Sequence, residues 1–528
     1  LVPAIRAPAA THICLEVLNM ENMPKLTGMG RRVVGSMMML PVLWYVGYFD
    51  WWFLARAQQM LVTITCLITL AVYLSPKWPD PDMDPVSAVI MNKQDLLPPG
   101  SVTHLTLVFY FDDCPDFAKV KEDAKALLEY KRFCSVPVPC REAVFESSWR
   151  EVEVKYDEHF GEVKVNSDEE FEAQLDRFAL KPFTQGKDMP MWRMDVLRNS
   201  AEKGRSAVVW RLSHAIGDGI GLLPVGFKFA RTVDGKPAEP KSFRPKRRRS
   251  GSSKDGGFGK MLNSLIKDLK TVANLANGPF DNCSSVNINH QKPTLEHNGK
   301  RMRLDFDFQL DDIRSIKRST GYTINDIVVA LFAGAVRRYM ACMKDKALEN
   351  PDGIKMSGLA PFAQPRGTRP GQVQNKMVFV HFSFPVGPAT MKERLEKAHQ
   401  EFDHLKRSMQ VPLLRILSEA GTKLGLEKAL AAENTKIWHR TSWVFSNVPG
   451  PRETMIVFGK EMTSFKPFYC NVLHQAIFFS YAGTMSLGLV LDTDSIKKPK
   501  LLIQCFKEEL EAAKKETSVD DYKQGFSE

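Results

Sequence analysis

A histidine and an aspartate stand four residues apart in the glycine-rich segment RLSHAIGDGIGLL, residues 211–223. A neutral imidazole is available near pH 7 to accept a proton and return it, so His214 has the chemistry of a general base. Gly217 and Gly219 argue against a helix here, and Asp218 is therefore expected to pin a loop. The residues alone equally allow a structural histidine whose aspartate caps a turn.

The elements around this segment indicate how it is positioned. A strand that runs into a glycine turn is predicted for RSAVVWRLSHAIGDG. A loop at the end of a strand can position a base so that it faces a cleft. Upstream, THLTLVFYFDD predicts a strand and FAKVKEDAKALLEYKRF predicts a helix. Further on, TINDIVVALFAGAVRRYM predicts a helix that Thr323 caps together with Asp326, and KPKLLIQCFKEELEAAKKE predicts a terminal amphipathic helix. This order of predicted strands and helices indicates an α/β sandwich rather than a doubly wound sheet.

Length and charge narrow the functional class. The 528 residues predict two domains, and the net charge of +11 suits a partner that carries phosphates, such as an anionic membrane surface or a nucleotide-containing cofactor. Nucleic acid is not expected as a partner, because basic and aromatic residues are not interleaved in a binding motif. The nine cysteines are scattered without a CxxC pair, so we expect neither a disulfide framework nor a metal site.

Two uncharged apolar runs, residues 33–49 and 60–74, precede the rest of the chain. Each is short for a membrane span of about 20 residues. Arg31, Arg32 and Lys77 flank the pair on its outer sides, which predicts a membrane hairpin with both ends in the cytosol. The alternative is a buried helical pair that belongs to the soluble body.

Several motifs together resemble one known family. SHAIGDG is similar to the HHxxxDG motif of the wax ester synthase/diacylglycerol acyltransferase family, part of the CoA-dependent acyltransferase superfamily that includes chloramphenicol acetyltransferase. PMW at 190–192, NDIVVA at 325–330 and SNVPGP at 446–451 resemble three further family motifs, in the family's order, and the matches extend from about residue 88 to 515. A further segment resembles the family through Arg366, Asn375 and Pro385.

One position departs from the family pattern. Ser213 stands where the family has the first histidine of its pair. Elsewhere in the superfamily a single HxxxD histidine suffices, and it corresponds to His214. The base is retained, while the serine leaves open a changed alcohol pocket or a weakened activity.

The resemblance implies a fold of two chloramphenicol-acetyltransferase-like α/β domains, α+β sandwiches that meet at a central tunnel. Together with the apolar runs, it gives the expected organisation of the chain. The expected parts are an N-terminal segment (1–32), a membrane hairpin or membrane-associated helices (33–74), an N-terminal acyltransferase domain with HxxxDG (88–234), a basic linker and crossover helix (235–298) and a C-terminal acyltransferase domain (299–517).

The resemblance also assigns chemical roles. His214 would take the proton of an alcohol as its oxygen attacks an acyl-CoA thioester, and would then protonate the departing thiolate of CoA. Asp218, with Gly219, would hold the loop through an ion pair with an arginine. Asn325 and the NVPGP turn also have plain structural interpretations, as a helix start and a turn. The candidates for substrate contact or for stabilising the oxyanion are Ser213, Asn325, Asp326, Ser446, Asn447 and Gly450.

The implied activity is transfer of a long-chain acyl group to a fatty alcohol, to diacylglycerol, or to both. Acyl-CoA would be a co-substrate, with no permanently bound cofactor, and membrane lipids would be partners. The expected location is a membrane, that of the endoplasmic reticulum first and otherwise a lipid droplet or the plasma membrane, with the catalytic body in the cytosol. Alternatives are another acceptor, such as a sterol, or a membrane lipid-binding protein of the same fold whose catalysis is impaired.

Overall fold

The computed structural model describes residues 82–92, 104–139, 147–181, 183–186, 188–201, 204–238, 301–364, 373–423, 425–470 and 473–518, with 268, 272, 281 and 284–286 between them. The chain divides into two units, Leu1–Tyr73 and Leu74–Glu528, and every described residue belongs to the second. The N-terminal segment, the predicted membrane hairpin and most of the linker at 235–298 lie outside the described residues.

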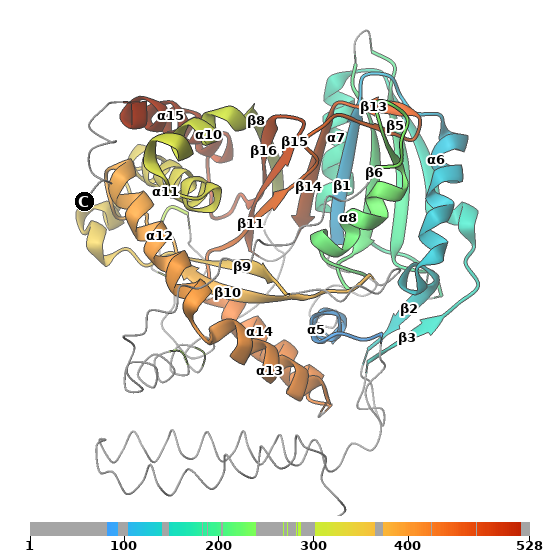
Figure 1. The fold of residues 1–528 in the computed structure, drawn as a ribbon, viewed down its shortest axis with the longest axis horizontal. Coiled ribbons are helices and arrows are strands. Elements are labelled where there is room, and N and C mark those ends of the chain that lie inside the picture. The colour runs from blue at the N-terminus through green and yellow to red at the C-terminus, as the bar shows by residue number, and fades with distance from the viewer. Residues whose placement is uncertain are drawn as a thin grey trace, which may run out of the picture. The chain divides into compact units, whose positions relative to one another are not determined.

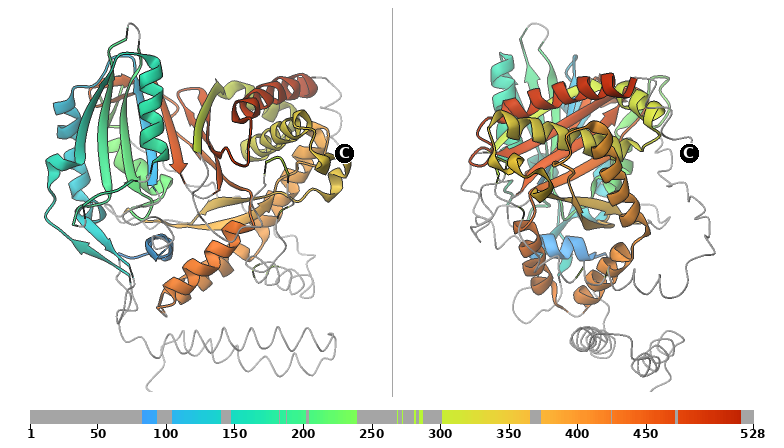
Figure 2. Two further views of the ribbon diagram at one scale, coloured as in Figure 1. Left: turned by 180° about the vertical axis from the view of Figure 1, so that it is seen from behind. Right: turned by 90° about the vertical axis from the view of Figure 1, so that its left-hand side faces the viewer.

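A five-stranded sheet of order β14-β1-β6-β5-β4 organises the first half of this unit. The strand β1 is apolar on both faces because both are covered. Its even-numbered residues pack with the helix α7 (Asp168–Leu180), and its odd-numbered ones with α6 (Phe117–Ala124) and α8 (Gly219–Lys228), on the opposite side (Figures 1 and 2). The strands are β1 (His104–Phe111), β4 (Phe160–Val165), β5 (Trp192–Asn199), β6 (Ser206–Ser213) and β14 (Ser464–Cys470).

A six-stranded mixed sheet of order β10-β9-β11-β15-β16-β8 organises the second half. In β15 (His474–Tyr481) the side chains alternate between two faces: Ala476 and Phe478 pack in the core with the helices, and Ile477 and Phe479 belong to the core shared with the first half. The other strands are β8 (Arg301–Gln309), β9 (Ser357–Ala363), β10 (Met377–Ser383), β11 (Trp443–Pro449) and β16 (Thr484–Asp492), and the core helices are α10 (Leu310–Thr320), α11 (Ile324–Cys342), α12 (Met391–Arg407) and α15 (Pro499–Ser518).

Shorter elements complete the described part of this unit. The strands β7 (Ala230–Thr232), β12 (Met455–Val457) and β13 (Lys460–Met462) form a small sheet beside α8, and β2 (Ser135–Val138) pairs with β3 (Ser148–Glu151). The remaining helices are α5 (Pro85–Asn92), α13 (Gln410–Lys423) and α14 (Glu427–His439), and the 3-10 turns are Lys125–Glu129, Lys131–Cys134, Tyr156–His159, Lys346–Glu349 and Pro351–Gly353.

The strand β14 interlocks the two halves. It follows the second half's β11 in sequence, yet it pairs antiparallel with β1 of the first sheet, with Leu107 opposite Pro467 (Figure 1). An ionic cluster around the buried Arg303 lies beside this crossing. Arg303 on β8 donates to Asp176 of α7 at 2.9 Å and to Asp305 at 2.9 Å, and it also pairs with Glu172. The ionic contacts therefore tie α7 of the first half to β8 of the second.

The predicted α/β class is confirmed, and so are the strand before His214 and the helix that Thr323 and Asp326 cap together. The expectation that glycines keep this segment out of a helix is wrong from Gly219 onward, because α8 begins there with Asp218 as its N-cap. The Asp218 side chain accepts the backbone N–H of Gly221, and this N-cap hydrogen bond stabilises the start of the helix despite its glycines. The predicted long helix after β1 ends at Ala124 and continues as 3-10 turns.

No single helix in the described ranges combines the length and the apolar character of a membrane span. The pair α10 and α11, bent by 106° at the break between them, meets that criterion only when taken together. The central part of α11 is buried in the core of the second half.

Replacing Arg303 by Met should lower the free energy of unfolding by about 3 kcal/mol, because the change leaves carboxylates without their shared cation. Arg303 is only 4% exposed at its side chain, whereas the carboxylates of Glu172 and Asp176 are partly exposed, which keeps the loss moderate. Denaturant unfolding of the full chain measures the loss. Arg314→Met is the matched control, since Arg314 pairs with Asp311 at an exposed site, and its change should stay within about 0.5 kcal/mol.

Candidate active site

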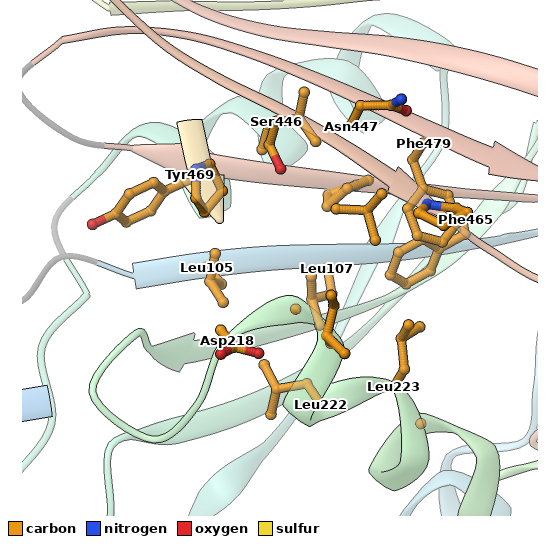
Figure 3. A pocket seen from close by; sticks show the side chains of 18 of the residues that line it. Leu105, Leu107, Asp218, Leu222, Leu223, Ser446, Asn447, Phe465, Tyr469 and Phe479 are labelled. Carbon is orange, nitrogen blue, oxygen red and sulfur yellow. The ribbon is translucent and has the colours of Figure 1, made fainter. Parts of the chain in front are cut away.

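A cavity of about 250 Å³ lies between the two halves of the described unit. Its walls are β1, β14 and α8 from the first sheet and its cover, and β11 and β15 from the second (Figure 3). Most lining side chains are aliphatic or aromatic. Few lining side chains carry a charged group, an amide, an imidazole or a hydroxyl, and these are His214, Asp218, Asn325, Ser446, Asn447, Tyr469, Gln475 and Tyr481.

His214 follows the last residue of β6 and lines this cavity. It is 7% exposed, and its ring lies 5.0 Å from the ring of Tyr469, centroid to centroid. Burial lowers the pKa of His214 below its ordinary value, while Asp218, Asn375 and Asp84 act in the opposite direction. The imidazole is therefore neutral at pH 7, the form that can accept a proton.

The backbone around His214 is held by a side chain from the second half. The amide Nδ2 of Asn375 donates to the carbonyl oxygen of His214 at 2.8 Å and to Ser87 Oγ at 3.0 Å. The Oδ1 atom of Asn375 and the Nδ1 atom of His214 are both buried. Asn375 thus fixes the base at its main chain.

A buried ion pair supports the same turn from the other side. Arg132 and Asp84 contact each other at 2.8 Å with almost no exposure. Arg132 Nη1 donates to the carbonyl oxygens of Ala215 at 3.2 Å and Ile216 at 3.0 Å. Asp84 in turn accepts the backbone N–H of Asn375 at 3.1 Å. The turn after His214 has no regular secondary structure, and these contacts satisfy its buried carbonyls.

Asp218 joins the two halves through its carboxylate. Oδ1 accepts the backbone N–H of Gly221 at 2.7 Å and caps α8, and Oδ2 accepts the backbone N–H of Lys376 at 2.8 Å. Gly217 precedes it at a close approach, since a Cβ there would lie 2.5 Å from Val373. Both residues hold the loop that carries the base, through backbone contacts in the case of Asp218, and the ion pair with an arginine expected for Asp218 stays a prediction.

Three of the expected oxyanion candidates line the cavity. Asn447 Nδ2 donates to Asn325 Oδ1 at 2.8 Å, which leaves the NH₂ group of Asn325 as a donor. Ser446 precedes Asn447 on β11, and Figure 3 shows it across the cavity from Asp218 and Leu105. The structure thus brings His214, Asp218, Gly219, Asn325, Ser446 and Asn447 to one cavity.

Three other candidates do not line it. Ser213 is fully buried, and its Oγ accepts the backbone N–H of Ala215 within the turn. Asp326 is enclosed because its carboxylate closes the capping box of α11 and contacts His399 Nδ1 at 3.0 Å. Gly450 packs against the chain, where a Cβ would lie 2.3 Å from the carbonyl oxygen of Ser480. In the structure these residues make local packing and capping contacts, and the substrate contact expected of them stays a prediction.

The supporting residues Asp84, Ser87 and Arg132 were not identified from the sequence. An aspartate before proline in DPVS is a helix-start signal, and Asp84 does accept the N–H of Ser87 at 2.7 Å. No sequence signal links that helix start to the turn after His214. In the part of the chain that the structure describes, no group of three or more His, Cys, Asp or Glu side chains is arranged to hold a metal ion.

Family models and curated proteins that match this chain all come from one family. The model of the wax ester synthase/diacylglycerol acyltransferase catalytic domain matches residues 145–328, and the WS/DGAT C-terminal domain model matches residues 373–514. Wax ester synthase/diacylglycerol acyltransferase 11 of Arabidopsis thaliana is 23% identical over 445 residues, which covers 75% of this chain and 90% of that protein. Wax ester synthase/diacylglycerol acyltransferase 2 of the same plant is 22% identical over 71% of this chain and 83% of that protein.

Solved structures share the fold. The wax ester synthase/diacylglycerol acyltransferase from Marinobacter aquaeolei VT8 superposes with a TM-score of 0.53 at 15% identity, over 83% of this chain and 100% of that chain. The first condensation domain of the calcium-dependent antibiotic synthetase superposes with a TM-score of 0.54 at 11% identity, over 83% of this chain and 97% of that chain. At these identities the likeness concerns the fold alone.

Replacing Asp218 by Asn should remove one of its two bridging hydrogen bonds, because the amide offers a donor where one backbone N–H needs an acceptor. We expect a loss of about 1–2 kcal/mol in the free energy of unfolding, and faster hydrogen exchange at the amide of Gly221 or Lys376. Asp116→Asn is the matched control. Asp116 caps α6 with one oxygen at an exposed site, and asparagine caps equally well. Equal unfolding curves for the two variants would contradict the bridging role.

Proposed function

This chain belongs to the wax ester synthase/diacylglycerol acyltransferase family, and we propose that it transfers a long-chain acyl group from acyl-CoA to a fatty alcohol, to diacylglycerol, or to both. One observation supports the proposal most directly. A buried, neutral histidine lines an apolar cavity to which both halves of the molecule contribute. Such a cavity suits hydrocarbon substrates, and such a base suits the ionisation of a hydroxyl group during attack.

In the proposed reaction, the hydroxyl oxygen of the acceptor attacks the thioester carbonyl carbon as the ring of His214 takes the hydroxyl proton. The carbonyl oxygen becomes an oxyanion in a tetrahedral intermediate. The intermediate collapses, the bond from carbon to sulfur breaks, and the imidazolium protonates the departing thiolate. The products are the ester and free CoA, and His214 returns to its neutral form.

The surroundings of His214 favour this sequence of steps. An alcohol is too weak an acid to ionise beforehand, so the base must be neutral and close when attack begins. Donors for the oxyanion would come from the Ser446 hydroxyl, Asn325 or Asn447, all of which line the cavity. The apolar walls limit access of water, which would otherwise compete as an acceptor.

We propose attachment to a membrane, that of the endoplasmic reticulum first, with the catalytic body on the cytosolic side. Fatty alcohols, diacylglycerol and their esters dissolve in bilayers, and the apolar runs at 33–49 and 60–74 suit attachment there. The net charge of +11 would also attract acyl-CoA, whose head carries phosphates. Acyl-CoA is then a co-substrate rather than a resident cofactor.

A second candidate function rests on Ser213. If the family's first histidine is needed for turnover, the chain would bind lipid at a membrane without catalysing transfer. The hydrogen bond from Ala215 shows that serine is well accommodated in the turn, a local role that does not require catalysis. A different acceptor, such as a sterol, is the alternative within the enzymes.

Replacing His214 by Ala should lower ester formation by about 10²-fold or more, because the reaction loses its general base. Membranes that contain the full chain are given acyl-CoA with hexadecanol, with diacylglycerol or with a sterol, and the ester is quantified. His404→Ala is the matched control, since His404 does not line the cavity and should leave the rate unchanged. Activity retained by the His214 variant would remove this residue from the mechanism, and an inactive wild type would favour the lipid-binding protein.

The rate should also fall at low pH as His214 becomes protonated. Burial lowers the pKa of His214, so the acid limb of log kcat/KM should lie below the ordinary histidine value of about 6.5. Asp218 raises this pKa, and Asp218→Asn should therefore move the limb to still lower pH. An acid limb above the ordinary value, or one that moves upward in the variant, would contradict the assignment of the limb to a buried His214.

A further inference from the structure

The floor of the cavity is a pair of strands with matched apolar side chains. Leu105, Leu107 and Phe109 point into the cavity from β1, since alternate residues of a strand face the same side. Their partners on β14 also line it: Leu105 lies opposite Tyr469, Leu107 opposite Pro467, and Phe109 opposite Phe465. The floor is therefore a continuous track of aliphatic and aromatic side chains, among which Tyr469 also carries a hydroxyl group.

The two ends of this track differ: the base lies at one end and phenylalanine side chains lie at the other. His214 follows Ser213, which pairs with His104 at the beginning of β1, so the base lies at the Leu105 end. From Leu105 to Phe109 the strand advances about 13 Å, at about 3.3 Å for each residue. Figure 3 shows the same direction, with Asp218, Ser446 and Tyr469 toward one end and Phe465 and Phe479 toward the other.

An aromatic cluster lines the end of the cavity away from the base. The ring centroids of Phe109 and Phe465 are 5.0 Å apart, and those of Phe465 and Phe479 are 4.7 Å apart. Tyr481 lies at the same end, and its hydroxyl is already engaged by the N–H of Met455 and the carbonyl of Met462. This end thus offers apolar contact and suits a methyl terminus rather than a polar group.

The helix α8 forms a side of the same track. Gly219, Leu222, Leu223 and Gly226 line the cavity at helical spacing, over about 10 Å from the first of these residues to the last. A Cβ placed on Gly226 would meet nothing within 4 Å. Glycine in a helix interior is unfavourable by about 1 kcal/mol relative to alanine, yet here it keeps the cavity wide two turns beyond the base.

We propose that this track binds one saturated, unbranched hydrocarbon chain with its methyl end at the aromatic cluster of Phe109, Phe465 and Phe479, and that Phe465 and Gly226 set the chain length accepted. All three side chains line the cavity, where Phe465 is half-buried and Phe109 and Phe479 are buried. The inference rests on the proposed acyl transfer. The chain belongs either to the acyl group or to the alcohol, and the experiment separates these two sources.

The test measures kcat/KM for a ladder of saturated acyl-CoAs with one alcohol, and then for a ladder of saturated alcohols with one acyl-CoA. Phe465→Ala should raise the preference for the next longer chain by roughly tenfold in one ladder, because one methylene in an apolar pocket discriminates by about that factor. Gly226→Leu should shift the preferred chain length in the same substrate series toward shorter chains. The substrate series whose preferred chain length changes, acyl-CoA or alcohol, identifies which substrate the track holds.

Phe306→Ala is the matched control, because Phe306 on β8 packs against Phe308 and Phe506 outside the cavity and should leave both profiles unchanged. Phe465→Leu keeps an apolar side chain and replaces Phe465→Ala if that variant does not fold. An active wild type whose two profiles stay fixed in the Phe465 and Gly226 variants would overturn the inference.

If the wild type forms no ester with any pair of substrates, the proposed transfer fails, and calorimetry of saturated fatty acid binding then tests the track alone. The same opposite shifts in preferred length between the Phe465 and Gly226 variants would support the inference. Equal length preferences in both variants would overturn it.

Discussion

The buried carbonyl groups that follow β6 set the main constraint on this molecule. A base can stand at the end of a strand inside an apolar cavity only if the irregular backbone beneath it finds donors. Asn375 supplies one from the second half and Arg132 supplies others from the first, and the contact with Asp84 fixes Arg132 in turn. The turn of His214 is therefore complete only when both halves are in place.

The lining of the cavity reflects the side-chain spacing of two kinds of element, strands and a helix, that lie next to this turn. The alternation along β1 and β15 directs every second side chain into it, and the helical spacing along α8 adds a third side. Asp218 links these elements, because one carboxylate oxygen begins α8 and the other binds the backbone of Lys376. The geometry of the base and the shape of the cavity thus depend on the same few contacts.

Local features could be predicted from the sequence, and features between distant segments could not. The apolar run of β1, the Thr323 cap of α11 and the strand before His214 depend on neighbours in the chain, and the structure has them as predicted. The helix α8 was missed because glycine propensity argued against it, whereas a buried cap and tertiary packing outweighed that cost. The contact of Asn375 with His214 joins residues 161 positions apart, and no periodic pattern in the sequence indicates it.

The crossing of β14 has a consequence for the synthesis of the chain. Near the end of β1, the carbonyl oxygen of Tyr110 accepts a hydrogen bond from Thr463, 353 residues further along. One edge of β1 therefore stays unpaired until most of the polypeptide has left the ribosome, and an exposed apolar edge is a template for aggregation. Folding of the first half must be completed after translation of the second, so a truncated nascent chain would depend on chaperones for its solubility.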